Sequence, residues 1–409
     1  MRLLYIADGR SPISLSWIEY FIRTGHEVHL ASTFPCEAIH GLASMVVIPV
    51  ALSGIYGQPG TRDKGRGKLL RGLLPVALRT RIRQLMAPLS FSRAADNLTD
   101  LIKQIQPELV HAMRIPYEGM IASLAIEQLS TGNDDIRKSP LLISVWGNDF
   151  TLHAQSTRRM AACTRQALQT CTGLHTDCQR DQRLAKAWGF DDSKPRIVLP
   201  GGGGVRMDLF FPLESEQQAG VSRPQPGIPA IKAINPRGFR AYVRNDTFFH
   251  AIPRVINQYP NIHFICPGMK DEERVHRWVL ELGIGSKVEL LPPQSRQQMA
   301  ELYRQAQLSL SITTHDGTPN TLLEAMACGC FPIAGDIESL REWITPGVNG
   351  LLVEPGNPKA LAEAILKAIS SPELRKQAGE RNIQLVKERA EYERCMDRAE
   401  KFYLQLIGK

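Results

Sequence analysis

Short apolar runs alternate with amphipathic helical stretches along most of this chain, and this alternation constrains the fold more than any other feature. A short apolar run between turn residues is typical of a strand that a parallel sheet buries on both faces. Strands that alternate with helical stretches indicate βαβ units. The sequence therefore predicts an α/β fold built from parallel sheets.

The first set of strands fills the first half of the chain. Residues 3–8 are predicted as a strand, and the loop, helix and second strand that follow span 9–14, 16–24 and 27–31. One βαβ unit is therefore complete at the very start, and it lacks the GxGxxG pattern of a dinucleotide-binding dehydrogenase. Further strands are predicted over residues 46–50, 109–112, 141–145 and 196–199.

A second set of strands fills the other half. Between the two sets lie four consecutive glycines, Gly201–Gly204, and a polar stretch over 213–230 whose proline and glycine content indicates a linker. The glycine run fits either a flexible loop or a backbone that must approach a ligand closely. The second set of strands spans 231–234, 263–266, 287–291, 308–312, 331–334 and 350–353, and two helices follow from Lys359 and from about Glu391.

The two sets predict two Rossmann-like domains, residues 1–212 and 213–390, that face each other across a cleft. At 409 residues the chain can give each domain its own core, and its 43% hydrophobic and 22% charged residues are ordinary for a globular protein. No apolar run has the length of a membrane span, and the first residues enter a strand without a basic leader region. We therefore expect a cytoplasmic protein.

The eight cysteines form no CxxC pair, so the sequence does not indicate the zinc and redox sites that such pairs build. We expect free thiols. An acidic DxD segment, which could anchor a metal ion, is absent as well. We therefore predict that the chain uses neither a metal ion nor another cofactor.

Positive charge is concentrated in one segment. The chain carries a net charge of +8, and residues 62–83, with eight basic side chains against Asp63 alone, contribute +7 of it. Because little excess remains elsewhere, a general nucleic-acid surface is not indicated. Within and after this segment, Leu78, Ile82 and Leu85 share a helical face, which fits a basic helix on the anionic inner face of a membrane. The alternative is a solvated helix that packs on its own domain.

Residues 308–335 form the most informative local unit of the second set. Leu308–Ile312 is predicted as a buried strand, Asp316–Asn320 as a turn, and the apolar run from Thr321 as a helix. Gly329 fits the left-handed position just past the helix end, and the next strand follows it. The loop lies at the carboxyl end of a strand, where open α/β sheets bind ligands.

Two acids, Asp316 and Glu324, flank this loop. The free N–H groups and the dipole of the helix start favour an anion such as phosphate. Because acids repel phosphate, the two carboxylates are better explained by hydroxyl groups beside it, and phosphate beside several hydroxyls indicates a nucleotide sugar. In the alternative interpretation, Asp316 only forms a turn and Glu324 completes a capping box with the N–H of Thr321.

These residues carry a resemblance to a known family. The spacing Asp316-x7-Glu324 is similar to the E-x7-E signature of retaining glycosyltransferases of family GT4, which have the GT-B fold. The whole second half resembles the donor-binding domain of that family, through residues 267–268, 281–292, 303–313, 322–335 and 349–365. The first half resembles it more weakly, through residues 6–12, 25–30, 107–112, 146–149 and 204–210.

The resemblance implies roles for the matching residues of the donor domain. Glu324 would hold ribose hydroxyls, and Asp316 would contact the donor sugar. Arg237 would neutralise the diphosphate, with Arg244, or else Arg240, in place of the usual lysine, and the planar guanidinium suits phosphate. Further donor contacts would come from the loop and the helix start, at Gly317, Thr318, Asn320, Thr321 and Leu322.

The resemblance also points to residues on the acceptor side of the cleft. Asp149 is the candidate catalytic residue there, with a helix cap as the alternative. His111 fits either a catalytic histidine or a satisfied core histidine. Trp146 stands where some relatives have a histidine, and Arg10 lies in a shortened glycine-rich loop. The last helix of the family crosses back to the first domain, which assigns residues 391–409 there.

The implied activity is transfer of a hexose-type sugar from a nucleoside diphosphate such as UDP to an acceptor hydroxyl, without a metal ion. The α configuration would be kept, and the leaving phosphate would accept the acceptor's proton. The basic segment fits a lipid-linked or cell-surface glycan acceptor, and hence polysaccharide biosynthesis. Among the departures from the family, the pair Thr318-Pro319 would reshape the sugar pocket. Two alternatives stay open, a sugar-nucleotide epimerase of the same fold and a non-catalytic glycosyltransferase-like partner protein. The second is indicated by Asp316 in place of glutamate and by the histidines missing at Met113 and Trp146.

Overall fold

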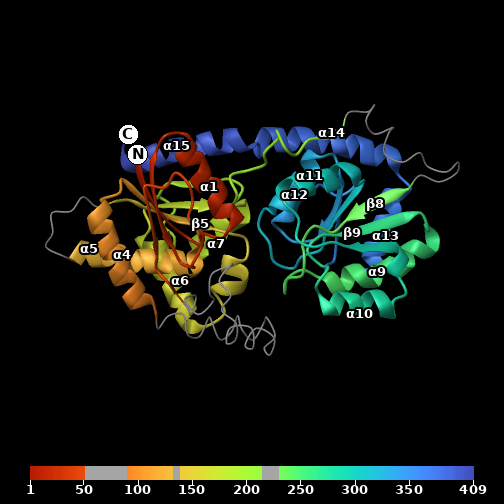
Figure 1. Cartoon of the computed structure of the whole chain (residues 1–409), viewed down its shortest axis with the longest axis horizontal. Helices are drawn as coiled ribbons and strands as arrows, with labels where there is room; N and C mark the ends of the chain where they lie inside the picture. Colours follow the sequence, from red (N-terminus) through yellow and green to blue (C-terminus); the bar gives the residue numbers. More distant parts are fainter. Residues whose placement is uncertain (51–89, 132–138, 214–229) are drawn as a thin grey trace. The chain divides into compact units, whose positions relative to one another are not determined.

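The computed structural model describes residues 1–50, 90–131, 139–213 and 230–409 (Figure 1). These residues form two compact units, one made of Met1–Gly203 together with Cys395–Lys409, and the other of Gly204–Arg394. The predicted basic segment 62–83 and nearly all of the predicted linker 213–230 lie outside the described residues.

The described part of the first unit has a seven-stranded parallel sheet at its centre. The strand order is β3-β2-β1-β4-β5-β6-β7, so the order reverses between β1 and β4. Ligands bind open α/β sheets at such a topological switch point. The strands are β1 (Arg2–Ala7), β2 (Glu27–Ser32), β3 (Ser44–Val47), β4 (Leu109–Ala112), β5 (Leu141–Val145), β6 (Gly173–Thr176) and β7 (Arg196–Val198).

Helices cover both faces of this sheet. On one face, α4, α5 and α6 pack against apolar strand residues such as Ile6, Val110 and Ile143. On the other face, Trp17 of α1 and Tyr403 of α15 lie against His111 of the sheet. The helices are α1 (Pro12–Arg23), α4 (Phe91–Ile105), η3 (Ile115–Gly119), α5 (Met120–Thr131), η4 (Asp149–His153), α6 (Arg158–Thr170), α7 (Gln179–Ala187) and α15 (Tyr392–Ile407), whose first residues belong to the second unit.

The second unit repeats the same design. Its described residues contain a six-stranded parallel sheet in the order β10-β9-β8-β11-β12-β13, and the order reverses between β8 and β11. In Figure 1, α9 and α10 lie on one side of β8 and β9, and α11 and α12 lie on the other. The strands are β8 (Ile231–Ile234), β9 (Ile262–Cys266), β10 (Val288–Leu290), β11 (Leu308–Ser311), β12 (Phe331–Gly335) and β13 (Leu351–Val353). The helices are α9 (Asn245–Gln258), α10 (Glu273–Glu281), η5 (Gly285–Lys287), α11 (Arg296–Gln305), α12 (Asn320–Ala327), η6 (Leu340–Glu342), α13 (Pro358–Ile369) and α14 (Pro372–Arg389).

The predicted class, α/β with two Rossmann-like parallel sheets, is confirmed, and the differences are local. Helix α1 begins at Pro12 rather than at residue 16, because proline fits the first helical position. Strand β3 ends at Val47, earlier than predicted, while β6 and the 18-residue helix α14 were not predicted at all. Only four residues of α14 are buried, so its sequence lacks the apolar stripe that reveals a helix.

The division between the two units falls within the four-glycine run, after Gly203, and glycines on either side of it make close contacts within their own unit. In the first unit, the carbonyl of Gly201 accepts a hydrogen bond of 2.7 Å from the indole of Trp17. In the second unit, Gly204 has φ +108°, and a Cβ there would lie 2.4 Å from the carbonyl oxygen of Ala390. The close approach at Gly204 therefore excludes any side chain at this position.

A chain of buried hydrogen bonds ties α15 to the sheet of the first unit. Tyr403 contacts Tyr5 (Oη–Oη, 3.2 Å) and His111 (Oη–Nδ1, 2.5 Å). The chain continues from His111 Nε2 to Ser144 Oγ at 2.7 Å, and from Ser144 Oγ to His175 Nδ1 at 2.8 Å. It ends where His175 Nε2 meets the carbonyl of Leu199 at 2.9 Å.

The direction of every bond in this chain follows from its last link. Burial lowers the pKa of His175 to about 4 and that of His111 well below its ordinary value, so both rings are neutral. A carbonyl only accepts, so His175 Nε2 carries the proton and its Nδ1 accepts from the Ser144 hydroxyl. His111 Nε2 then donates to Ser144, and Tyr403 donates to His111 Nδ1. His111 is therefore a satisfied core histidine, one of the two readings that its sequence context allows.

Tyr403→Phe removes the donor to His111 and leaves the buried Nδ1 lone pair without a partner. We expect the free energy of unfolding of the first unit to fall by about 1–3 kcal/mol, the usual cost of an unsatisfied buried group. Urea denaturation measures it. Tyr242→Phe, which removes a hydroxyl bonded to the exposed Arg240, is the matched control and should change stability little. Equal stability of the Tyr403 variant and the wild type would contradict the hydrogen-bond chain.

Candidate functional site

The reversal of strand order in the second unit brings two predicted site residues together. Arg237 follows β8, and Asp316 follows β11, its neighbour in the sheet. Both therefore lie at the carboxyl end of the sheet, at the topological switch point where open α/β folds bind ligands. No local sequence pattern predicts this contact, because 79 positions separate the two residues.

Arg237 is held by an acid and a hydroxyl. Its Nη2 donates to Asp316 Oδ2 at 2.5 Å, and its Nη1 donates to Thr321 Oγ1 at 3.1 Å. The two charged side chains are only 8% and 16% exposed. Its Nε is buried and has no hydrogen-bond partner among the described residues. The guanidinium is thus fixed in direction and still has N–H groups to offer, the buried Nε–H among them.

Thr321 belongs to the start of α12, and the structure corrects the sequence prediction here. The helix begins at Asn320 with Pro319 as its N-cap residue, and no side chain caps it. Glu324 is therefore inside the helix, and the capping-box interpretation of Thr321 and Glu324 is wrong. A helical N–H normally donates to the carbonyl one turn earlier in the same helix. Asn320 and Thr321 are the first two residues of α12, so the helix has no such carbonyl for their N–H groups. The N–H of Leu322, by contrast, donates to Pro319 at 3.0 Å.

Glu324 has an unusual environment for a carboxylate. It is partly buried, and its side chain makes no hydrogen bond or ion pair to any residue that the structure describes. Burial raises the pKa of Glu324 to about 7, although Arg296 and Arg237 both act to lower it. A buried carboxylate without partners is costly, so this group is suited to a ligand that brings its own hydroxyl donors.

The loop between Asp316 and α12 is held by the segment that follows β12. Ser339 Oγ donates to the carbonyl of Asp316 at 2.7 Å, and Trp343 Nε1 donates to Thr318 Oγ1 at 3.0 Å. Gly317 and Thr318 are both buried, so the Thr318 side chain does not extend into solvent. Neither Ser339 nor Trp343 was predicted as a site residue, because no local pattern reveals a contact between segments more than 20 residues apart.

The other two arginines of the predicted set lie outside this cluster. Arg244 is the N-cap residue of α9, and its Nε and Nη2 donate to the carboxylate of Asp246 at 2.8 and 2.7 Å. Its charge is therefore already paired on the partly exposed surface. Arg240 is exposed and donates to the hydroxyl of Tyr242 at 3.0 Å. Only Arg237 of the three is bonded to Asp316.

In the first unit, the candidate Asp149 is fully buried. Its Oδ1 accepts from Arg114 Nε at 2.9 Å, and its Oδ2 accepts from the backbone N–H of Trp146 at 3.0 Å. Burial raises the pKa of Asp149, against the opposite effect of Arg114. Both carboxylate oxygens are thus engaged in fixing the turn after β5. Arg114 was not predicted, although a charged residue two positions after a predicted strand is a usable signal.

Trp146 and Arg10 complete the predicted set in the first unit. Trp146 is partly exposed, and its indole nitrogen is buried with no partner in the described part of the chain. Arg10 donates from Nε and Nη2 to Asp8, at 2.9 Å each, and its guanidinium lies 3.7 Å above the ring of Phe34. The structure therefore places these two residues and Asp149 after β1 and β5, at the carboxyl end of the first sheet.

One group of side chains in the first unit has the composition of a metal site. The ligand atoms of Asp177, Cys178 and Asp181 all lie within 4.8 Å of one another, and all three residues are buried. Arg180 already supplies positive charge there, since its Nη2 lies 2.8 Å from Asp181 Oδ1. The arginine occupies the role that a cation would have, so this group does not favour a metal ion.

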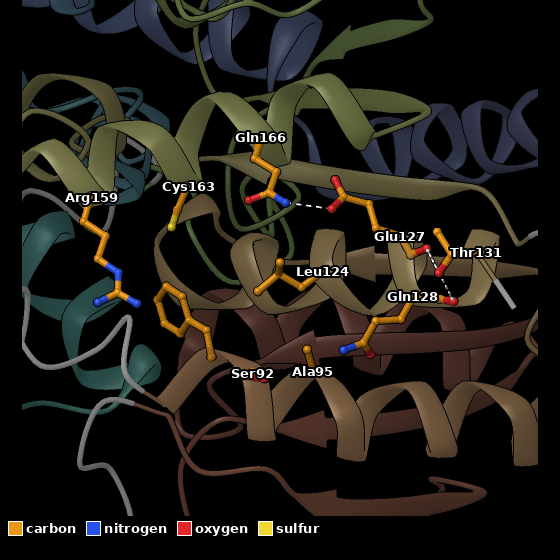
Figure 2. Close-up of a pocket in the computed structure, with 10 residues that line it drawn as sticks. Ser92, Ala95, Leu124, Glu127, Gln128, Thr131, Arg159, Cys163 and Gln166 are labelled. Atoms are coloured by element: carbon orange, nitrogen blue, oxygen red, sulfur yellow. Dashed lines mark hydrogen bonds between the residues drawn. The ribbon is translucent and has the colours of Figure 1, made fainter.

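A cavity of about 430 Å³ lies between α4, α5 and α6 of the first unit (Figure 2). Phe91, Ala95 and Leu124 give it apolar walls, and Gln166 donates to Glu127 beside it at 2.7 Å. None of the predicted site residues lines this cavity. It is therefore separate from the cluster around Arg237.

Comparisons with known proteins show the family to which the chain is similar. The family model for "Glycosyl transferase 4-like" proteins matches residues 2–177, and the model for "Glycosyl transferases group 1" matches residues 233–385. The D-inositol 3-phosphate glycosyltransferase of Streptomyces bingchenggensis (strain BCW-1) is 24% identical over 217 residues, which are 50% of this chain and 46% of that protein. The chain spans about half, or less, of the length of the curated relatives it matches.

Solved structures resemble the chain over its whole length. The sucrose-phosphate synthase of Thermosynechococcus elongatus covers 100% of both chains with a TM-score of 0.75 and 16% identity. Anabaena Alr3699/HepE in complex with UDP-glucose covers 98% of this chain and 99% of its own, with a TM-score of 0.68 and 14% identity. At these identities the likeness concerns the fold alone, and it confirms the predicted GT-B fold.

The raised pKa of Glu324 makes a prediction about stability. A carboxyl with a folded pKa of about 7 and an ordinary value of 4.5 costs the folded state free energy once it is ionised. We expect Glu324→Gln to increase the free energy of unfolding by about 1–3 kcal/mol at pH 8, and to have no effect below about pH 4.5, where both states are protonated. Urea denaturation across this pH range measures the difference.

The matched control is Glu380→Gln, which neutralises an exposed glutamate on α14. This variant should leave the pH dependence of stability unchanged. A Glu324→Gln variant that is less stable than the wild type at pH 8 would show that the carboxylate has a stabilising partner, and would contradict the description above.

Proposed function

The chain belongs to the glycosyltransferases of the GT4 type, and on this premise we propose that it transfers a sugar from a nucleoside-diphosphate sugar to an acceptor hydroxyl. The product keeps the α-anomeric configuration. The observation that carries this proposal is the cluster at the β8–β11 switch point, where Arg237, Asp316 and the partnerless carboxyl of Glu324 surround the start of α12.

Each member of the cluster matches one part of such a donor. The diphosphate lies at the helix start, where the N–H groups of Asn320 and Thr321 and the helix dipole favour an anion. Arg237 binds the diphosphate through its fork of N–H groups. Asp316, relieved of part of its contact with Arg237, accepts hydrogen bonds from the sugar, and ionised Glu324 accepts them from the ribose. Arg244 reaches the diphosphate by leaving Asp246.

The chemical step depends on electrostatic stabilisation. As the bond between the sugar and the phosphate breaks, negative charge builds on the leaving diphosphate and positive charge on the sugar ring. Arg237 and the α12 start stabilise the diphosphate in a fixed, partly buried setting, where such contacts act most strongly. The leaving phosphate oxygen accepts the proton of the attacking hydroxyl. The chemistry requires no pair of carboxylates of the kind that hydrolases use.

The choice of donor and acceptor draws on a structural neighbour and on the sequence of the basic segment. Anabaena HepE was solved with UDP and UDP-glucose, which makes UDP-sugars the first donors to test. We propose a lipid-linked or cell-surface glycan as the acceptor, because residues 62–83 have the sequence of a basic amphipathic segment. No helix in the described part of the chain is long and apolar enough to cross a membrane.

A panel of UDP-, GDP-, ADP- and dTDP-sugars, each with and without candidate glycan acceptors, tests the proposed activity. Nucleotide release that rises when an acceptor is added is the expected result. Interconversion of the sugar nucleotides without an acceptor would identify an epimerase. A protein that neither binds nor consumes any donor would be a non-catalytic relative, and the proposal would then be wrong.

Two substitutions separate nucleotide binding from the chemical step. Glu324→Gln should weaken UDP binding and remove its pH dependence, which in the wild type is a loss of affinity as pH falls below about 7. Arg237→Ala should lower turnover by about a hundredfold or more, the usual effect of losing one prearranged charge contact. Calorimetry and donor-consumption assays measure the two effects. Arg277→Ala, an exposed arginine on α10, is the control. Variants that bind and turn over donor like the wild type would refute the site.

The proposed membrane contact has its own test. Replacing Arg79, Arg81 and Arg83 with glutamine should reduce sedimentation of the protein with vesicles that contain anionic phospholipid. Each basic residue near such a surface contributes about 1 kcal/mol, so losing three should weaken binding by roughly a hundredfold. The same substitutions should not alter the small background sedimentation that is seen with neutral vesicles. Unchanged sedimentation with anionic vesicles would exclude this role of the segment.

A further inference from the structure

The loop from Asp316 to Pro319 carries the sugar-facing acid of the proposed site, and it has no regular secondary structure of its own. Two side chains from the segment after β12 hold it. Ser339 Oγ donates to the carbonyl of Asp316 at 2.7 Å, and Trp343 Nε1 donates to Thr318 Oγ1 at 3.0 Å. The first bond fixes the backbone of the acid, and the second fixes the side chain two residues later.

Trp343 is itself anchored on several sides. Its side chain is only 6% exposed, and the guanidinium carbon of Arg389 lies 4.3 Å from the centre of its ring. Its carbonyl accepts from Asn349 Nδ2 at 2.9 Å, and the same amide donates to Asn382 Oδ1 of α14 at 2.9 Å. The loop is thus connected through Trp343 to a rigid helix.

The chemistry of the Trp343–Thr318 bond gives it one direction. An indole N–H can only donate, so the Thr318 oxygen must accept, and the hydroxyl cannot rotate that lone pair away without losing the bond. Thr318 is 5% exposed, so water does not readily replace the indole as a donor. Removing the N–H therefore takes one hydrogen bond from the loop and leaves the loop freer to shift.

The opposite side of the loop faces Arg237. The carboxylate of Asp316 is bonded to Arg237, whereas its carbonyl is bonded to Ser339. When a diphosphate competes for Arg237, the contact on the carboxylate weakens. The bonds to Ser339 and Trp343 do not involve Arg237, so they can keep the loop in place during that exchange.

We propose that Trp343, assisted by Ser339, is a positioning residue for the donor sugar. It touches neither the nucleotide nor the sugar in this proposal, which rests on the proposed function; it holds Asp316 and Thr318 where the sugar needs them. A misplacement of about 1 Å at a reacting centre can cost about a hundredfold in rate. Loss of this anchor should therefore slow turnover while nucleotide affinity, which depends on Glu324 and Arg237, persists.

Hydrogen–deuterium exchange of the free protein tests the anchor without any ligand. Trp343→Phe keeps most of the ring and removes only the donor. We expect amide exchange across residues 317–322 to rise about fivefold to tenfold, the equivalent of one hydrogen bond. Trp278→Phe is the matched control in the same unit, because that indole makes no hydrogen bond to a described residue, although its ring packs on Phe249 and lies under the guanidinium of Arg274. Unchanged exchange in the Trp343 variant would overturn the proposal.

Kinetics then test the positioning role. With a UDP-sugar that the wild type consumes, Trp343→Phe should lower kcat about tenfold to a hundredfold and change the Kd for UDP by less than about twofold. Ser339→Ala, a smaller change, should act in the same direction. Faster exchange together with unchanged kcat would overturn the positioning role, as would parallel losses of kcat and UDP affinity. A wild-type protein that neither binds UDP nor consumes a donor would refute the proposed function instead. The exchange experiment needs no ligand, so it distinguishes a failure of the proposed function from a failure of the Trp343 anchor.

Discussion

The ion pair between Arg237 and Asp316 is the contact on which the rest of the second unit's site depends. The two residues follow different strands and meet only because β8 and β11 are neighbours where the sheet reverses its strand order. Through Thr321 the same arginine binds the start of α12, so the position of Glu324 also follows from it. Deleting one partner would leave the other charge nearly buried and unpaired, which is strongly destabilising. The strand order, the loop that carries Asp316 and the start of α12 therefore depend on one another.

In the proposed function, this arrangement gives up some stability for a donor site that is formed before the ligand binds. Most buried polar groups in native proteins have a partner. Within the described residues, Arg237 Nε has no hydrogen-bond acceptor. The Glu324 carboxylate has no hydrogen-bond donor there, and burial raises its pKa to about 7. Arg237 bonds the start of α12 and Glu324 lies inside the same helix, so the cost is confined to one region. Buried polar groups without partners lower the stability of the folded state, and such groups are expected at sites that bind hydroxyl and phosphate groups.

The sequence predicted the sheets because strands such as Leu109–Ala112 are apolar runs with clear ends, a signal that depends only on neighbouring residues. Strand β6 was missed because Gly173–Thr176 is short and mixed, and α14 because it buries too few side chains. Asp316 and Glu324 were predicted as site residues from their spacing. The roles of their neighbours were not, because the partners of Thr318 and Asp149 come from distant segments, as Trp343 and Arg114 do.

The burial of Tyr403 against His111 has a consequence for the order in which the protein matures on the ribosome. Residues 5, 111, 144 and 175 are synthesised early, yet the hydroxyl that completes their hydrogen-bond chain emerges only after the whole of Gly204–Arg394. The later unit is continuous in sequence and can finish first. Until residue 403 has emerged, Trp17 and Phe21 lack the tyrosine ring that stacks against them, so the first unit completes its packing only after the second unit has been synthesised.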